Sequence, residues 1–316
     1  MPSQPTDYIL FVHGVSVRES AANERQKSYR YADRLFNLIQ AELPSCKLQK
    51  VPLYWANVSD EVLEEFRPWI NKAPAWKNFW FKDFRSQQLM QFIGDAALYI
   101  SRHVGSEAVM QLQEQAFECL QGYQPKDRLH LVTHSWGTVV LFDMLFASRW
   151  DNPEISGHKS IEKIRRNIFG VPPNSPDGIR LASIHTMGSP IALFSLITMV
   201  GRTNAGSSHD ISPRLEQLLK NVCQDGSKLP WRNFIHPGDP IGLPLEEVIP
   251  KLVDRGEQYI DIADILTSGS GLLELLAKPV KSTFLALING GNAHGSYWEN
   301  PEVARTIART ISQATY

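Results

Sequence analysis

Apolar runs of strand length alternate with helical patterns along most of this 316-residue chain. The alternation predicts an α/β fold with a mostly parallel, twisted sheet flanked by helices, because parallel strands need a crossover that is usually helical. We expect a single domain over residues 1–316, with helices at about 22–43, 138–149 and 301–314. Strands are expected at 8–12, 48–55, 129–133, 179–187, 231–236 and 259–265. Pro52 predicts an edge position for the second strand, since proline cannot donate to a sheet ladder.

Two segments do not fit this alternation. Residues 56–127 are too many for a simple crossover, and their helical pattern predicts an inserted cap or side wall. A second insertion is expected over 266–290. The first insertion is rich in aromatic side chains: Phe66, Trp69, Trp76, Phe79, Trp80, Phe81 and Phe84. The second contains Leu272, Leu273, Leu275 and Leu276 beside Gly269 and Gly271.

The balance of charges excludes one class of partner. Lys and Arg number 32 against 33 Asp and Glu, which gives a formal net charge of −1. A chain whose main partner is nucleic acid needs an excess of cationic side chains, so no nucleic-acid partner is expected. The sequence also has no GxxxxGK[ST], GxGxxG or HExxH motif. We therefore predict neither a cofactor nor a metal.

The cysteines and the first residues indicate a cytoplasmic protein. Cys46, Cys119 and Cys223 are widely spaced and odd in number, which is typical of free thiols in a reducing compartment. The N-terminus has no basic region of a signal peptide, although a leaderless exported protein would share this feature. The longest apolar stretch, 191–200, is far shorter than the roughly 20 residues that span a bilayer. Peripheral membrane contact through the aromatic insertion stays open, although no strongly basic amphipathic helix supports it, and no feature indicates the oligomeric state.

A serine lies in a sharp turn between one predicted strand and the next helix. The sequence Thr133-His134-Ser135-Trp136-Gly137 has a glycine two residues after the serine, as in a nucleophile elbow. Such a turn exposes the serine oxygen above the sheet, and Gly137 lets the helix approach closely. The position that is usually the first glycine of this motif is Thr133. An ordinary turn serine is the alternative, but the position between a strand and a helix favours a nucleophile.

A nucleophilic serine needs a base, and it needs a carboxylate that fixes the tautomer of that base. Both are expected after late strands, because sites in open α/β sheets form at the carboxyl ends of the strands. Asp239 follows the predicted strand 231–236 in a Pro-Gly-Asp-Pro turn and is the predicted acid, with Asp261 and Asp254 as alternatives. His294, in a glycine-rich loop before the last helix, is the predicted base.

Three other histidines have weaker assignments. His134 adjoins the serine and is expected to help shape the elbow. His185 lies within a predicted strand and is expected in the core, whereas His236 at a strand end is an alternative base.

The oxyanion of an acyl-transfer intermediate needs backbone donors. The N–H of Trp136, directly after the serine, is the first candidate. The second is expected from the loop after the first strand, His13-Gly14-Val15, where the Val15 N–H is the candidate.

The segments FVHG, THSWG, MGSP, HPGDP and NAHGSYW occur in this order, and together the chain resembles the α/β-hydrolase superfamily, in particular its lipase-like and esterase-like branch. The resemblance covers essentially the whole chain outside the two insertions. It implies a Ser135–Asp239–His294 triad that acts without a cofactor. Because the first predicted strand is the one that bears the oxyanion loop, we expect a fold without the antiparallel N-terminal hairpin of many members. The 266–290 insertion is expected near the active site.

The function that follows from this resemblance is that of a serine hydrolase, which cleaves carboxylic esters through an acyl-enzyme. The aromatic insertion and the apolar stretches at 191–200 and 272–288 favour a lipophilic acyl substrate, either a small-molecule or a lipid ester. These residues could instead pack the insertions onto the sheet. Two alternatives stay open, because one fold hosts many functions. They are a thioesterase or amidase with the same triad, and an inactive hydrolase-fold binding protein.

Overall fold

The computed structural model places the predicted strands in one sheet. It describes residues 4–15, 29–55, 60–74, 102–169, 178–193, 210–267 and 293–314, with the single residues 76, 94, 99 and 171. Every strand pair among these residues is parallel. The strands are β1 (Thr6–Val12), β2 (Lys47–Leu53), β3 (Arg128–His134), β4 (Ile168–Phe169), β5 (Ile179–Met187), β6 (Leu229–Ile235) and β7 (Ile260–Leu266).

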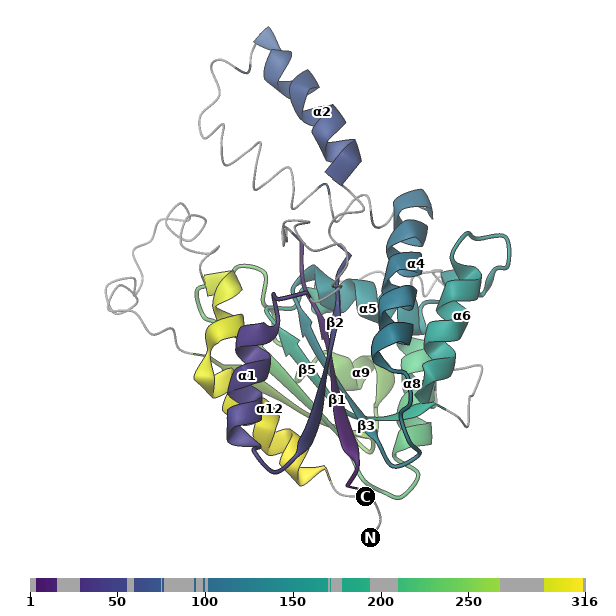
Figure 1. The fold of residues 1–316 in the computed structure, drawn as a ribbon, viewed down its shortest axis with the longest axis vertical. Coiled ribbons are helices and arrows are strands. Elements are labelled where there is room, and N and C mark those ends of the chain that lie inside the picture. Colours follow the sequence, from purple (N-terminus) through teal and green to yellow (C-terminus); the bar gives the residue numbers. More distant parts are fainter. Residues whose placement is uncertain are drawn as a thin grey trace, which may run out of the picture.

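The strand order is β2-β1-β3-β5-β6-β7, and the short β4 pairs with the start of β5. β2 is therefore an edge strand, which confirms the interpretation of Pro52. The expected fold class, a mostly parallel sheet flanked by helices, is also confirmed (Figure 1). Because all these strands run the same way, the loops that follow β1, β3, β5 and β6 meet at one edge of the sheet.

Helices cover both faces of the sheet (Figure 1). α1 (Asp33–Glu42) and α12 (Pro301–Gln313) pack against each other on one face. On the other face lie α4 (Arg102–Cys119), α5 (Trp136–Phe146), α6 (His158–Asn167) and α8 (Ser212–Val222). All of β1 is buried, because Ile9 and Phe11 face the first layer and Leu10 and Val12 face the second. Burial of both faces explains why the strands are apolar runs rather than alternating ones.

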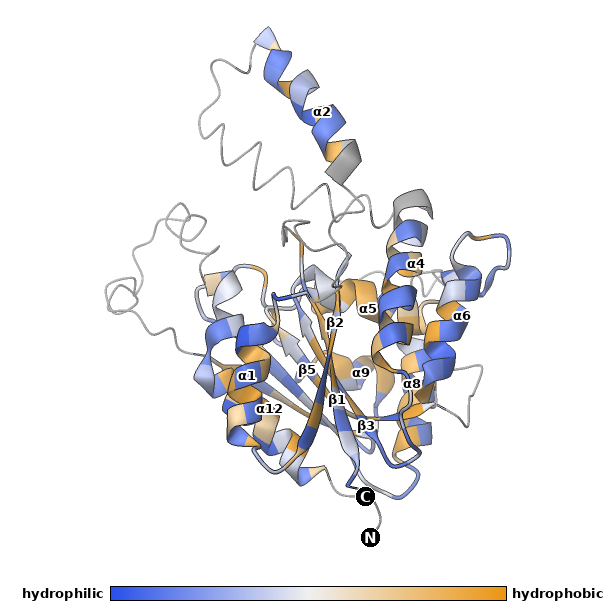
Figure 2. Cartoon of the chain, viewed as in Figure 1, coloured by the Kyte–Doolittle hydropathy of each residue, from blue (hydrophilic) through white to orange (hydrophobic). Residues whose placement is uncertain are grey.

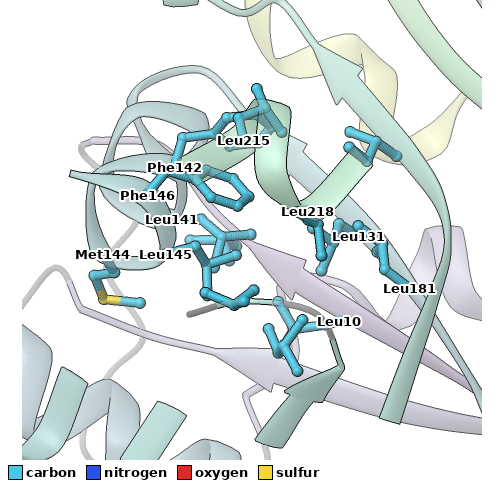
Figure 3. Close-up of a cluster of buried hydrophobic side chains, with 14 of the residues drawn as sticks. Leu10, Leu131, Leu141, Phe142, Met144, Leu145, Phe146, Leu181, Leu215 and Leu218 are labelled. Atoms are coloured by element: carbon cyan, nitrogen blue, oxygen red, sulfur yellow. The ribbon is translucent and has the colours of Figure 1, made fainter. Parts of the chain in front are cut away.

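The larger core lies between the sheet and α5 and α8. Residues 137–146 of α5 are all buried, and Figure 2 colours this helix as almost wholly hydrophobic. A helix with no polar face must be central, and its packing holds the residue at its N-terminus, Ser135, in a fixed position. Figure 3 shows the side chains that meet there, among them Leu10, Leu131, Leu181, Phe142, Phe146, Leu215 and Leu218.

Some helix boundaries differ from those predicted. α1 begins at Asp33 rather than near 22, and residues 16–28 lie outside the described part of the chain. α5 begins at Trp136 rather than 138, and it ends at Phe146 before a separate 3-10 turn, η4 (Ser148–Asp151). α6, α8 and the short α9 (Ile249–Val253) were not predicted. In α8, Pro at the start and Leu215, Leu218, Leu219 and Val222 on one face were available signals.

The last helix agrees with its prediction. Val303, Ile307 and Ile311 are buried on one face of α12. Asn300 caps the helix, because its side chain accepts hydrogen bonds from the backbone of Glu302 and Val303.

The described part of the predicted cap is helical. α2 (Asp60–Lys72) extends beyond the carboxyl edge of the sheet in Figure 1, whereas α4 packs on β2. Phe66 and Trp69 of α2 are 41% and 61% exposed, so these two aromatic rings are not buried against the sheet. Residues 77–93 and 268–292 lie outside the described part, so both insertions stay predictions. In the ranges that the structure describes, no helix is long and apolar enough to cross a membrane.

A chain of buried polar side chains crosses the sheet on the α12 face. Asp7 accepts from Nε2 of His130 at 3.1 Å, so Nδ1 of the neutral ring accepts from the Ser183 hydroxyl at 2.7 Å. Ser183 in turn accepts from Nε2 of His185 at 2.9 Å. A bulge in β5, where His130 pairs with Ser183 while Leu129 pairs with Leu181, brings the serine into line. The expectation that His185 is a core residue is confirmed, since its side chain is fully buried.

Replacing Ser183 by Ala should lower the free energy of unfolding by about 2–6 kcal/mol, because it leaves two buried polar groups without a partner and each costs about 1–3 kcal/mol. The substitution strands both His130 Nδ1 and His185 Nε2. Urea unfolding measures the effect. Ser312→Ala is the matched control, because that exposed hydroxyl donates to a backbone carbonyl on the surface of α12. Equal midpoints for the two variants would contradict the prediction.

Candidate active site

Ser135 lies at the turn between β3 and α5, as predicted, and its backbone is strained. Its φ and ψ are 53° and −133°, a conformation that is rare for a residue with a side chain. Strain of this kind costs about 1–3 kcal/mol and persists only where the surrounding structure enforces it. Here the Ser135 N–H is held by the carbonyl of Met187 at the end of β5, at 2.9 Å. The serine therefore has the backbone geometry of a nucleophile elbow.

Two glycines are required by close approaches at this turn. A Cβ on Gly137 would lie 2.2 Å from the carbonyl oxygen of His13, so the start of α5 could not pack against the loop after β1. A Cβ on Gly14 would lie 2.5 Å from Cβ of Ser135 and 3.0 Å from its Oγ. The His13-Gly14 loop therefore lies directly against the serine side chain.

Thr133 stands where the nucleophile-elbow motif usually has its first glycine, and the turn accommodates it. The side chain is fully buried, and its Oγ1 lies 2.9 Å from Oγ1 of Thr138 on α5. This hydrogen bond ties the end of β3 to the first turn of the helix. The threonine therefore adds a contact across the elbow without preventing the strained turn.

Asp239 and His294 meet, although they are far apart in the sequence. Nδ1 of His294 lies 2.9 Å from each carboxylate oxygen of Asp239. Oδ1 also accepts from the N–H of Ile241 at 2.9 Å, and Oδ2 accepts from the hydroxyl of Tyr297 at 2.7 Å. Burial alone would raise the pKa of this carboxyl, but the hydrogen bonds and the imidazole lower it to about 2. Asp239 is therefore an anion at neutral pH, and it fixes the proton of His294 on Nδ1.

Tyr297 and Gly188 also belong to this cluster, although neither was among the predicted site residues. A Cβ on Gly188, which has φ 53°, would lie 2.5 Å from Oδ2 of Asp239 and 3.1 Å from Nδ1 of His294. Only glycine leaves room at the end of β5 for the carboxylate and the imidazole. Both residues stand in segments, MGSP and NAHGSYW, that carry the resemblance, but a positive φ and a three-way contact leave no separate signal in one sequence.

The remaining polar atoms of the serine and the histidine have no partner. Within the described part of the chain, Ser135 Oγ and His294 Nε2 are both buried and accept or donate no hydrogen bond. Because Nδ1 holds the proton of His294, Nε2 has a free lone pair. A buried polar atom without a partner calls for an explanation, and a catalytic role is one of those that apply.

His134 contacts the backbone of the loop that carries His294. Its Nε2 lies 2.6 Å from the backbone carbonyl of His294, and the two rings are 4.6 Å apart. Burial and the neighbouring His294 lower the pKa of His134 to about 3, so the ring is neutral and donates from Nε2. His134 thus contacts the histidine loop in addition to its expected place at the elbow.

The loop after β1 is anchored by Trp55, which follows the edge strand β2. Nε2 of His13 accepts from the Trp55 N–H at 3.2 Å, and the indole N–H donates to the His13 carbonyl at 3.0 Å. With Nε2 as the acceptor, Nδ1 carries the proton and contacts the carbonyl oxygen of Gly14 at 2.5 Å. Since a peptide bond holds C=O and N–H on opposite sides, the Val15 N–H points away from the His13 ring.

The alternative acids and the alternative base are engaged elsewhere. Asp254 accepts from the N–H groups of Gln258, Tyr259 and Ile260 and so shapes the loop before β7. Asp261 pairs with Arg232 at the surface. Nδ1 of His236 accepts from the nearby Gly238 N–H. In the described ranges, no group of three or more His, Cys, Asp or Glu side chains could hold a metal ion.

No protein-family model matches the sequence, and no curated protein sequence matches it significantly. An acetyl xylan esterase structure is 10% identical over 99% of both chains, with a TM-score of 0.32. Est1E from Butyrivibrio proteoclasticus is 10% identical over 99% of this chain and 90% of that chain, with a TM-score of 0.33. A thioesterase from the prodiginine pathway in Streptomyces coelicolor is 14% identical over 92% and 86%, with a TM-score of 0.27. Likenesses at such low TM-scores support no conclusion about activity.

Stability should fall as the pH decreases from 6.5 towards 4. Burial lowers the pKa values of His130, His134 and His185 below their usual 6.5. In this window the unfolded chain binds protons that the folded chain does not, and each histidine contributes a slope of at most about 1.4 kcal/mol per pH unit. The lowered pKa values of Asp7 and Asp239 act only below about 3.8.

Urea unfolding between pH 4.5 and 7.5 measures this slope. A His185→Phe variant keeps a buried ring without its titration, so its unfolding free energy should depend less steeply on pH. An unfolding free energy that stays constant over this range in the unmodified protein would show the prediction to be wrong.

Proposed function

We propose that this chain is a serine hydrolase of the α/β-hydrolase superfamily and that it cleaves carboxylic esters with Ser135, His294 and Asp239. One observation carries the proposal. The bond from His294 Nδ1 to Asp239 leaves Nε2 as a buried lone pair, and the hydroxyl of the strained Ser135 is likewise buried without a partner in the described part of the chain. General-base activation uses an acceptor and a donor of this kind, and it requires that the two come within hydrogen-bond reach of each other.

In the proposed mechanism, Ser135 Oγ attacks the ester carbonyl while His294 Nε2 takes its proton. The negative charge of Asp239 stabilises the imidazolium that forms. The same proton then passes to the leaving alcohol, and an acyl-enzyme remains. Water repeats the sequence, with His294 as its base, and frees the acid and the serine.

The oxyanion of the intermediate is proposed to bind the N–H groups of Trp136 and Val15. The first is at the N-terminus of α5, where the helix dipole also favours negative charge. Support for the second comes from the close contact of Gly14 with Ser135 and from the peptide orientation that His13 imposes. Both donors are held before substrate arrives, which is how such groups stabilise a transition state effectively.

The substrate is proposed to be an ester with a lipophilic acyl group. The exposed aromatic pair Phe66 and Trp69, whose rings are 6.1 Å apart on α2, supports an apolar approach at the carboxyl edge of the sheet. Rates on p-nitrophenyl acetate and on longer acyl esters test this. A steep preference for acetate would contradict a lipophilic acyl group. Faster cleavage of a matched thioester or amide would show that an ester is not the preferred scissile bond.

A fluorophosphonate probe tests the hydrolase itself. We expect covalent labelling, and peptide mapping should place it on Ser135. Heat-denatured protein is the control, because labelling requires the folded site. A folded protein that is not labelled would contradict the proposed serine hydrolase and favour the binding-protein alternative.

A further inference from the structure

Tyr297 places a hydroxyl inside the acid–base pair. It lies in the short turn η5 (Ser296–Glu299) between His294 and α12, and its side chain is fully buried. The hydroxyl is 2.7 Å from Oδ2 of Asp239 and 2.8 Å from the backbone nitrogen of His236. Because an N–H can only donate, the His236 N–H takes the hydroxyl oxygen as its acceptor. The hydroxyl proton must therefore point at the carboxylate.

The phenol remains a donor under all working conditions. Burial and the adjacent anion of Asp239 raise the pKa of Tyr297, so it does not ionise near neutrality. Its hydrogen bond goes to Oδ2, the same oxygen that lies 2.9 Å from Nδ1 of His294. The phenol and the imidazole therefore share the negative charge of one carboxylate oxygen.

We propose that Tyr297 is a positioning residue of the Asp239–His294 pair: its hydroxyl locks the carboxylate in place and, by drawing on the charge of Oδ2, limits how basic the imidazole becomes. The inference rests on the proposed function, since it takes His294 as the base. It assigns the residue no contact with substrate. Its consequence is that the charge of Asp239 which faces the imidazole is shared with the phenol.

The other titratable groups around the pair leave Asp239 as its dominant charge. The ring centre of His134 lies 4.6 Å from that of His294 and 5.9 Å from that of Tyr297. It is neutral at working pH, as its pKa is about 3. His236, at the end of β6, contacts Tyr297 through its backbone, and its ring accepts from Gly238. A change of the hydroxyl at 297 therefore acts on His294 through Asp239.

The test removes the hydroxyl alone. In Tyr297→Phe, kcat should fall by about 10-fold, towards the lower end of what a hydrogen bond to a charged group contributes. The acid limb of the pH profile of kcat/KM should move up by about half a pH unit, since Asp239 then stabilises the imidazolium more strongly. Unchanged kcat and an unmoved acid limb would overturn the proposal, as would a shift of the limb to lower pH.

The chain offers a matched control in Tyr99. It is another buried tyrosine whose hydroxyl donates to a buried carboxylate, Oδ2 of Asp143 on α5, at 2.9 Å. Its ring contact with Trp55 is kept in Tyr99→Phe. This variant loses the same kind of hydrogen bond and should lower the melting temperature, yet its kcat and acid limb should match those of the unmodified protein. If Tyr99→Phe moved the acid limb as much as Tyr297→Phe, the effect would be one of general stability and the proposal would fail.

A second variant acts in the opposite direction and keeps the side chain. 3,5-Difluorotyrosine at position 297 is a more acidic phenol and a stronger donor, so the acid limb should move to lower pH. If Tyr297→Phe does not fold, the direction in which the acid limb moves in this variant tests the proposal instead. Labelling of the unmodified protein by a fluorophosphonate tests the proposed function separately from the role of Tyr297. A labelled protein whose acid limb responds to neither variant keeps the proposed function and loses the role of Tyr297, whereas an unlabelled protein loses the proposed function itself.

Discussion

Replacing Ser135 by Ala should reduce the turnover of a p-nitrophenyl ester by about 10⁶, the loss expected when a triad loses its nucleophile. The reason is chemical rather than structural: the alanine cannot form the acyl-enzyme, and the lone pair of His294 Nε2 then has no hydroxyl to activate. Steady-state rates measured with an ester blank give the effect. Activity within 10-fold of the unmodified protein would exclude Ser135 as the nucleophile.

The backbone of Ser135 supplies the control for this experiment. Its φ of 53° is a conformation that glycine adopts without strain. Ser135→Gly should therefore be as inactive as Ser135→Ala but more stable than it, by about 1 kcal/mol or more in urea unfolding. An inactive and stabilised glycine variant rules out unfolding as the cause of lost activity.

Replacing Asp239 by Asn should reduce turnover by about 10⁴. In the unmodified protein the carboxylate holds the proton of His294 on Nδ1, with each of its two oxygens 2.9 Å from that nitrogen. An amide presents an N–H on one side, favours the wrong tautomer and cannot stabilise the imidazolium. The loss should appear in kcat rather than in KM, because ground-state binding of the ester does not involve Asp239.

Asp254→Asn and Asp261→Asn serve as controls for that substitution. The first carboxylate holds three backbone N–H groups before β7, and the second pairs with Arg232. Neither should change kcat by more than about 3-fold, whereas Asp254→Asn should lower stability, because its hydrogen bonds are to a charged group. A greater loss of activity in either control than in Asp239→Asn would move the acid of the triad to that residue.

Much of the sheet could be predicted because each strand carries its own signal. β1 and β3 are short apolar runs that are followed directly by His13 and Ser135, and burial on both faces gives such runs their composition. Pro52 predicted the edge strand for a reason that holds in any sheet. The helix boundaries were less predictable, since α5 has no amphipathic pattern and its start depends on the elbow rather than on periodicity.

The candidate site was predictable where a residue type is tied to a position along the chain. Ser135 and Asp239 were proposed from their places after strands and His294 from its loop before the last helix, and the structure brings the last two together. Their catalytic roles stay predictions. Tyr297 and Gly188 could not be predicted in the same way. Their importance lies in a hydroxyl and a missing Cβ that meet one carboxylate in space, and nothing in the spacing of residues encodes that contact.

The order of the strands has a consequence for how activity would return after denaturation. The serine follows β3, the carboxylate follows β6 and the imidazole precedes the last helix, so these groups meet only when β3, β5 and β6 have paired and the last helix has docked. Pairings between distant segments form late, because the loss of chain entropy on closing long loops comes first. During refolding, the recovery of helical circular dichroism should therefore precede the recovery of ester cleavage, which makes catalysis a sensitive probe of the final assembly step.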